Sequence, residues 1–453
     1  MSEIVDEAVQ REGVAGSDVA VARGHWTRSP AAKVGGVLGL LVAMLIPQSL
    51  TSGLIHEREN RQADVLATFR NGWGPKQVVS GPALMVPYTY GPNLTQAGQV
   101  KGWLQLPPSS LTVTAELDPQ VRRRGLFRAI IYSAALKMSG VVTVPALSDV
   151  GQNPIDWASA RVVVRASDLR GLKPDQTLTW SNTTAAVQPS SADGCRPAIM
   201  SVPAGLTGAP SPGTVIPFEA ALTLRGTQAL HVAPIARQTS MHAISTWPTP
   251  AFNGVNLPIS YETGASGFDA NWEVAGDPAQ AGWRLLPACW ATYDQPDAGT
   301  APGVELQEAV PTYAMVDRAA KYGLFFLALA YLTLFLFEAL SRVRVHLVQY
   351  GLVGLSVSLF ALLLISIAEP LGFAVAYAIS AAAVILQASL YTLSVVRRAE
   401  LAGIFAGVLG GLFAFIYVVL SLDSYALLAG TVALFAILSV LMAVTRRVNW
   451  AAA

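Results

Sequence analysis

The chain has 453 residues, which is too long for one compact domain and predicts two or three folded units. Apolar residues make up 52% of the sequence and charged residues 13%, about half of the roughly 25% that is usual for soluble domains. With 30 basic and 29 acidic residues the net charge is +1, so there is no basic field for nucleic acid. These values exclude a disordered chain, a coiled coil and an ordinary cytosolic enzyme. They predict a membrane protein with a substantial water-exposed part.

The first apolar segment runs from Val34 to Ile55, after a polar stretch over residues 1–33 that we expect to be a disordered tail. About 20 apolar residues are needed to cross the hydrocarbon layer as a helix. The core of this segment resembles a signal peptide, but Pro47, Gln48 and Ser49 follow it in place of a cleavage pattern. We therefore predict an uncleaved membrane anchor over residues 34–55, kinked by Pro47.

Five more apolar segments follow in the last third of the chain. They are Tyr322–Ala339, Leu347–Ala368, Leu371–Val396, Leu401–Leu422 and Tyr425–Val444. The turns Glu369-Pro370 and Asp423-Ser424 are so short that they only join antiparallel neighbours. Residues 321–453 are therefore predicted to form a transmembrane bundle of five helices.

Basic residues predict the orientation of these six spans. They precede the first span, lie between spans two and three and between spans four and five, and follow span six: Arg23, Arg28, Lys33, Arg342, Arg344, Arg397, Arg398, Arg446 and Arg447. The alternate turns carry no Lys or Arg. The pattern predicts both termini in the cytoplasm and residues 56–320 on the far side of the membrane.

Residues 56–320 contain 19 basic and 20 acidic residues, as expected for a foldable exported domain. A charged helix over His56–Phe69 is predicted to continue from the first span. Short runs with strand character follow, separated about every ten residues by Pro, Gly and Ser: Leu111–Leu117, Ala160–Ala166, Gln176–Trp180, Val215–Leu224 and Met241–Thr246. They predict a mainly antiparallel β domain, a sandwich or a barrel, and hence a membrane α+β protein.

Three features of this domain leave the sequence open to more than one interpretation. Arg122–Leu136 is the best candidate for another helix, although a strand also fits. Ser181–Gly213, rich in Ser, Ala, Gly and Pro, is predicted to be a long surface loop. Cys195 and Cys289 are either a disulfide, which an oxidising compartment would permit, or two unrelated buried thiols.

Motifs for catalysis, metal or cofactor binding are missing from the sequence. His56-Glu57 lacks the second histidine of a zinc-protease helix, because Asn60 occupies that position. His231 and His242 lack a natural third zinc ligand. No Walker A loop, dinucleotide-binding glycine motif or nucleophile elbow is present, and we expect neither a metal nor a cofactor.

Polar residues are sparse in the predicted spans. For Glu338 we expect an ion pair with Arg342, four positions later, rather than a proton relay. Glu369 and Asp423 are predicted to cap turns, or to face the exported domain. Gln387 is expected to form a hydrogen bond between helices.

Glycines recur every four residues in the fifth predicted span, at Gly403, Gly407 and Gly411. Such a face of small residues lets helices approach closely. We expect it to pack inside the bundle, and a dimer face is the alternative.

Many short groups of residues, spread along the chain in a fixed order, together form a pattern that is more specific than any one motif. They are Glu57-Arg58, Arg61-Gln62, Trp73-Gly74, Gln77, Ser80-Gly81-Pro82, Pro87-Tyr88, Arg124-Gly-Leu-Phe-Arg128, Tyr132, Ser245-Thr-Trp-Pro248, Pro250, Phe252-Asn-Gly254, Leu257-Pro258, Gly267-Phe268, Glu338, His346, Gln349-Tyr350, Leu352-Val-Gly354, Ala376-Tyr377, Asp423-Ser-Tyr-Ala-Leu-Leu428, Thr445-Arg446 and Trp450. The pattern resembles the CreD family of bacterial inner-membrane proteins from about Leu54 to Trp450. It does not cover the first thirty residues or Ser181–Gly213.

The resemblance implies an inner-membrane protein of cell-envelope integrity, in some bacteria under a two-component regulator and connected with antibiotic and colicin tolerance. It implies no catalytic residues. Among the resembling residues, His346, Gln349 and Tyr350 are predicted to form a structural or coupling site at the start of the third span. Interfacial anchoring by the tyrosine and the histidine is the alternative.

Three functions are compatible with these observations. The leading hypothesis is a non-enzymatic envelope protein whose exported domain binds an envelope protein, a lipid or a wall component. A transporter or lipid-handling protein is the second, and a polar cavity lined by Gln387 or Glu338 would favour it. A wall-modifying hydrolase is the third, with His231, His242 and Asp269 as loose candidates.

Overall fold

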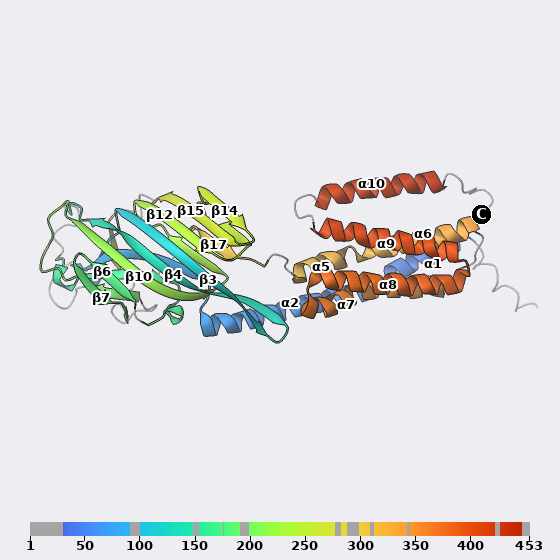
Figure 1. Cartoon of the computed structure of the whole chain (residues 1–453), viewed down its shortest axis with the longest axis horizontal. Helices are drawn as coiled ribbons and strands as arrows, with labels where there is room; N and C mark the ends of the chain where they lie inside the picture. Colours follow the sequence, from blue (N-terminus) through green and yellow to red (C-terminus); the bar gives the residue numbers. More distant parts are fainter. Residues whose placement is uncertain are drawn as a thin grey trace, which may run out of the picture. The chain divides into compact units, whose positions relative to one another are not determined.

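The computed structural model describes residues 30–90, 100–147, 154–174, 176–190, 199–276, 282–287, 299–308, 312–341, 345–421 and 426–445. The chain divides into two compact units, one made of Met1–Asn60 and Val310–Ala453 and the other of Arg61–Ala309. The first unit is helical and the second is built of β strands (Figure 1). The long helix α2 (Leu45–Trp73) contributes residues to both units.

The helical unit confirms the predicted N-terminal apolar helix and the predicted bundle of apolar helices. Its other helices are α1 (Pro30–Ala43), α5 (Thr312–Lys321), α6 (Gly323–Ser341), α7 (Leu347–Leu371), α8 (Phe373–Val396), α9 (Ala399–Ser421) and α10 (Ala426–Thr445). Within the described ranges, five helical stretches are long and apolar enough to cross a membrane: Lys33–Trp73, Thr312–Glu338, Leu347–Leu371, Phe373–Val396 and Ala399–Ser421. A further apolar helix of 20 residues, α10, lies beside α9 (Figure 1).

The helix of the first span is interrupted at Met44, between α1 and α2. Pro47 has no backbone N–H to donate to the carbonyl of Ala43, four residues earlier, and its ring crowds that carbonyl. The helix therefore ends at Ala43 and resumes at Leu45. Backbone hydrogen bonds continue on both sides, from Met44 to Leu40 at 2.9 Å and from Gln48 to Met44 at 3.3 Å.

Aromatic rings fill the core of the helix bundle. Phe413 of α9 lies 4.4 Å from Phe326 of α6 and 4.7 Å from Phe360 of α7, measured between ring centroids. Tyr377 of α8 packs edge-on against Phe360 and donates a hydrogen bond of 2.8 Å to the carbonyl of Phe413. Because lipid provides no hydrophobic drive for helix association, such packing and interhelical hydrogen bonds hold a bundle together.

The β unit consists of two sheets. Among the described residues, nine strands form the first: β13 (Pro250–Asn253), β17 (Gly303–Leu306), β11 (Ala229–Ala233), β1 (Gln77–Tyr90), β5 (Arg161–Ala166), β9 (Ile199–Pro203) and β8 (Gln188–Ser190) in that order, with β2 (Val100–Leu106) on β1 and β16 (Arg284–Pro287) on β2. Eight described strands form the second: β14 (Ser260–Gly264), β15 (Gly267–Ala275), β12 (Gln238–Ser245), β3 (Ser110–Arg124), β4 (Phe127–Thr143), β10 (Val215–Thr227), β6 (Thr177–Trp180) and β7 (Thr183–Ala186). Only β1–β11 and β3–β12 pair in parallel within these ranges, so the predicted antiparallel character is confirmed.

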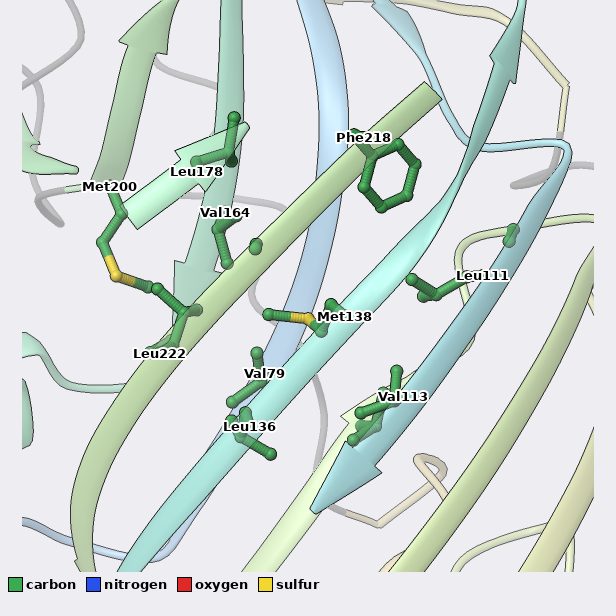
Figure 2. Packing of buried hydrophobic residues seen from close by; sticks show 14 of the residues in the cluster. Val79, Leu111, Val113, Leu136, Met138, Val164, Leu178, Met200, Phe218 and Leu222 are labelled. Atoms are coloured by element: carbon green, nitrogen blue, oxygen red, sulfur yellow. The ribbon is translucent and has the colours of Figure 1, made fainter. Parts of the chain in front are cut away.

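The large hydrophobic core of the unit lies between the two sheets, as in a sandwich. Along β10, buried and exposed residues alternate, so that the side chains of Ile216, Phe218, Ala220 and Leu222 all point inward. Figure 2 shows this core, with residues of both sheets facing one another: Val79, Val164 and Met200 from the first, and Leu111, Val113, Leu136, Met138, Leu178, Phe218 and Leu222 from the second.

Two sequence expectations for this unit differ from the structure. Arg122–Leu136 is not a helix: it forms the end of β3 and the start of β4, joined by a two-residue turn at Gly125-Leu126. Gly125 has φ +61°, which suits the first position of a tight hairpin turn. Ser181–Gly213 is not one loop, because β7, β8 and β9 lie within it. Ile199, Met200 and Val202 of β9 are buried, so a short apolar run forms a strand despite its polar surroundings.

Candidate functional site

A polar cluster joins α1, α6 and α7 in the helical unit. The ammonium group of Lys33 forms an ion pair with Glu338 Oε1. The hydroxyl of Tyr350 lies 3.5 Å from Glu338 Oε2 and donates to it. These three residues are called the Glu338 cluster below. The basic residue that pairs with Glu338 in the described residues is thus 305 positions away in sequence, and the expected ion-pair partner, Arg342, lies outside the described residues.

His346 and Gln349 form a capping box at the start of α7. The imidazole Nδ1 of His346 accepts a hydrogen bond from the backbone N–H of Val348 at 3.3 Å, and the side-chain oxygen of Gln349 accepts one from the N–H of His346 at 2.8 Å. This arrangement satisfies backbone donors that the first turn of a helix leaves open. It fixes where α7 begins, and Tyr350 follows in that first turn.

Replacing His346 with alanine is expected to lower the free energy of unfolding of the helical unit by about 1 kcal/mol, because the cap is lost. His346→Asn should keep nearly full stability, since asparagine is a strong N-cap residue. The measurement is the melting temperature of the purified full chain in mild detergent. Equal losses for both variants would contradict a capping role for the histidine.

A second polar cluster joins α2, α5 and α7 at the other end of α7. The carboxylate of Glu369 is 8% exposed and accepts a hydrogen bond of 3.1 Å from the hydroxyl of Tyr313. Arg58 Nη1 lies 3.6 Å from the same carboxylate oxygen. These three residues are called the Glu369 cluster. The structure therefore places Glu369 in a contact between helices, and the predicted turn at Glu369-Pro370 is wrong: both residues belong to α7, which ends at Leu371 and is capped by Gly372.

A third polar contact lies between these clusters along the first span. The side-chain amide of Gln48 donates to the backbone carbonyl of Ala320 at the end of α5. A methyl group at Gly323 would overlap the Gln48 side chain, so glycine leaves the space for this contact. The first span is therefore held to the other helices by polar groups near its start, in its middle and near its end.

The remaining predicted site residues of the helical unit lie elsewhere. Gln387 is on the outer surface of α8, where its side-chain oxygen accepts a hydrogen bond of 3.1 Å from Ser356 of α7. Gly403, Gly407 and Gly411 are exposed on α9, and a methyl group at each would meet no described atom within 4 Å.

Of the other residues that the sequence singles out, three lie outside the described residues and three lie in the two sheets of the β unit. Asp423, Cys195 and Cys289 lie outside the described residues. His242 and Asp269 are exposed neighbours with 3.0 Å between their side chains, whereas His231 is buried on β11 of the other sheet. In the part of the chain that the structure describes, no three His, Cys, Asp or Glu residues are grouped to bind a metal.

A buried glutamine forms a polar hub where α2 meets the sheets of the β unit. Gln77 is 0% exposed, and its amide nitrogen donates to the backbone carbonyls of Asp168 and Arg225, both at 3.1 Å. Its side-chain oxygen accepts hydrogen bonds from the hydroxyl of Ser167 at 3.1 Å and the N–H of Asp168 at 3.3 Å. Both polar atoms of this buried side chain thus form hydrogen bonds, and these bonds link the start of β1 to Ser167-Asp168 and to Arg225.

Aromatic residues complete this junction. The indole N–H of Trp73 donates to the carbonyl of Tyr132 at 3.1 Å, and the guanidinium of Arg225 lies 5.1 Å from the Trp73 ring centre. The buried hydroxyl of Tyr132 donates to the carbonyl of Ala229 at 2.6 Å, and burial raises the pKa of this tyrosine. A methyl group at Gly226 would overlap that hydroxyl. Spacing alone could not reveal this junction, although the resemblance quoted above includes Trp73, Gln77 and Tyr132.

Sequence comparisons with known proteins cover both units of the chain. A family described as "Inner membrane protein CreD" matches residues 29–451. The inner membrane protein CreD of Escherichia coli (strain K12) is 27% identical over 428 residues, which cover 92% of this chain and 93% of the E. coli protein. Both matches extend over the helical unit and the β unit alike. The chain therefore belongs to the CreD family of inner membrane proteins.

Proposed function

We propose that this protein supports the integrity of the cell envelope from the inner membrane, without a catalytic step. In this proposal the β unit lies in the periplasm and binds an envelope component, and the helices hold it at the membrane. One observation carries the proposal: the charged side chains Lys33, Glu338, Arg58 and Glu369 bridge one helix to another. Such contacts suit a stable scaffold.

The proposed orientation depends on the basic residues of the loops. Arg397 and Arg398 follow α8, whereas the connection from α7 to α8 at Gly372 carries no basic residue. Basic loops stay on the cytoplasmic side of bacterial membranes. The same rule puts the β unit on the opposite side from Arg398.

A fused reporter tests this orientation. An enzyme that is active only outside the cytoplasm should be active when fused after Thr263 and inactive when fused after Arg398. Total fusion protein, measured by immunoblot, controls for expression. Activity after Arg398 and none after Thr263 would overturn the proposed orientation.

The envelope role is tested with a strain that lacks the gene. We expect this strain to leak a periplasmic marker enzyme under detergent stress, and the full chain to restore retention. A chain without residues 61–309 should reach the membrane but fail to restore it. Normal retention in the deletion strain would contradict the proposed role.

A transporter or lipid-handling protein is the second candidate. The observation in its favour is that the hydroxyls of Tyr331 and Ser380 are buried in the bundle without a hydrogen-bond partner among the described residues. Against it, Gln387 lies on the outer surface and Glu338 is paired with Lys33. Substrate-dependent proton or ion flux in vesicles that contain the purified chain would favour this second function.

A further inference from the structure

The hairpin of β3 and β4 extends beyond both neighbouring strands. Pairing of β3 with β12 ends at Leu117, and pairing of β4 with β10 ends at Ile131. The two strands continue to pair with each other as far as Arg124 and Phe127. At about 3.3 Å per residue, the free ribbon extends roughly 23 Å past β12 and roughly 13 Å past β10. Residues 121–128 are called the hairpin tip below.

The hairpin tip combines exposed aliphatic and basic side chains. Val121 is 48% exposed and Leu126, in the turn itself, is 51% exposed. Four arginines in this short segment are exposed as well: Arg122, Arg123, Arg124 and Arg128. Apolar side chains flanked by arginines are typical of segments that lie in the headgroup region of a membrane.

The tip lies on the side of the β unit where the chain enters and leaves it. Trp73 contacts Tyr132, and Arg70 contacts Gln228, whose N–H binds the carbonyl of Ile130. From Trp73 towards its N-terminus, α2 therefore runs alongside β4 in the direction of the hairpin tip. Figure 1 shows α2 and the hairpin running to the same side of the β unit.

The other chain connection of the unit also lies beside the hairpin. Glu308 is close to the end of the unit, and its carboxyl group lies near enough to Arg128 for the positive charge to lower its pKa. Burial raises the pKa of Glu308, and the Arg128 guanidinium only partly offsets this rise. The chain thus both enters and leaves the β unit beside the hairpin.

We propose that the hairpin tip binds an anionic phospholipid surface, with Leu126 and Val121 in the headgroup layer and the arginines on lipid phosphates. This inference rests on the part of the proposed function in which the β unit binds an envelope component, and it names a lipid as one such component. The arginines supply the charge complementarity. Each basic residue near an anionic surface favours binding by about fivefold.

Photo-crosslinking of the full chain in vesicles tests this proposal. Leu126 is replaced with p-benzoyl-phenylalanine, and lipid adducts are measured by mass spectrometry in phosphatidylcholine vesicles with or without phosphatidylglycerol. Val215 gives a matched control position, because it is 56% exposed and pairs with Thr143 at the opposite end of β4. We expect abundant adducts at position 126 with phosphatidylglycerol present, and few at position 215.

Two triple variants test the arginines. Changing Arg122, Arg123 and Arg124 to glutamine should reduce the adducts at position 126 by about tenfold or more, and changing them to lysine should keep most of them. Unchanged tryptophan fluorescence verifies folding, since all three side chains are exposed.

Equal lipid adducts at positions 126 and 215, equal adducts without phosphatidylglycerol, or adducts only to protein would each overturn the proposal. The last outcome would identify a protein partner instead of lipid. If the lipid crosslinking fails, the leakage expected of the deletion strain is not affected. A normal phenotype together with strong crosslinking would contradict only the envelope role.

Discussion

Replacing Gln77 with leucine is expected to lower the free energy of unfolding of the β unit by about 4 kcal/mol. The side chain is fully buried and makes four hydrogen bonds, to Asp168 (two), Arg225 and Ser167. Leucine has a similar volume but would leave the backbone groups of Asp168 and Arg225 without this partner. Each polar group left unsatisfied in a core costs about 1–3 kcal/mol.

Urea unfolding of the full chain in detergent, followed by tryptophan fluorescence, measures this loss. Eight of the ten tryptophans lie in Arg61–Ala309, so the signal reports mainly on the β unit. Gln238→Leu is the matched control, because Gln238 is an exposed strand residue on β12, and its effect should stay within about 0.5 kcal/mol. A loss below 1 kcal/mol for Gln77→Leu would contradict the role of Gln77 as a hub.

The membrane spans could be predicted closely because hydrophobic length is a local property of the sequence. The segment predicted as Leu347–Ala368 is the helix Leu347–Leu371, and Leu371–Val396 is Phe373–Val396. Strands such as Val215–Leu224 were predictable for the same reason, since alternation on a half-buried strand is also local.

The region of Arg122–Leu136 shows where local reasoning fails. Arginine, leucine and alanine are good helix formers, and they favour a helix when considered alone. In the fold, Ala134 and Leu136 lie on the buried face of β4, between β3 and β10, so sheet pairing overrides local propensity. The turn residue Gly125 was the signal that indicated a hairpin.

The candidate site could be predicted as single residues but not as contacts. Glu338 and Glu369 stand out in the sequence because charges are rare in apolar spans. Their partners, Lys33 and Arg58, flank the first span on either side and lie hundreds of residues away. Only the packing of that span against the later helices brings the charges together, and no spacing rule encodes such packing.

Replacing Glu338 with alanine is expected to destabilise the helical unit by about 2–3 kcal/mol, because Lys33 keeps its charge without a partner. Removing one partner of a fully buried ion pair costs about 3–5 kcal/mol. The side chains of Lys33 and Glu338 are 27% and 20% exposed, so a smaller loss is expected here. The melting temperature of the full chain in mild detergent should fall by about 5 °C or more.

An exchange of charges separates the ion pair from other roles of Glu338. The double variant Lys33→Glu with Glu338→Lys should regain at least half of the stability that the single change Glu338→Lys removes. Asp317→Ala provides the matched control, because the Lys321–Asp317 pair is an i,i+4 pair with a 71% exposed lysine, and its loss should cost about 0.5 kcal/mol or less. If the losses of the two single charge reversals simply add in the double variant, Lys33 and Glu338 do not stabilise each other. The first span would then be held to the bundle by packing, by Gln48 and by the Glu369 cluster alone.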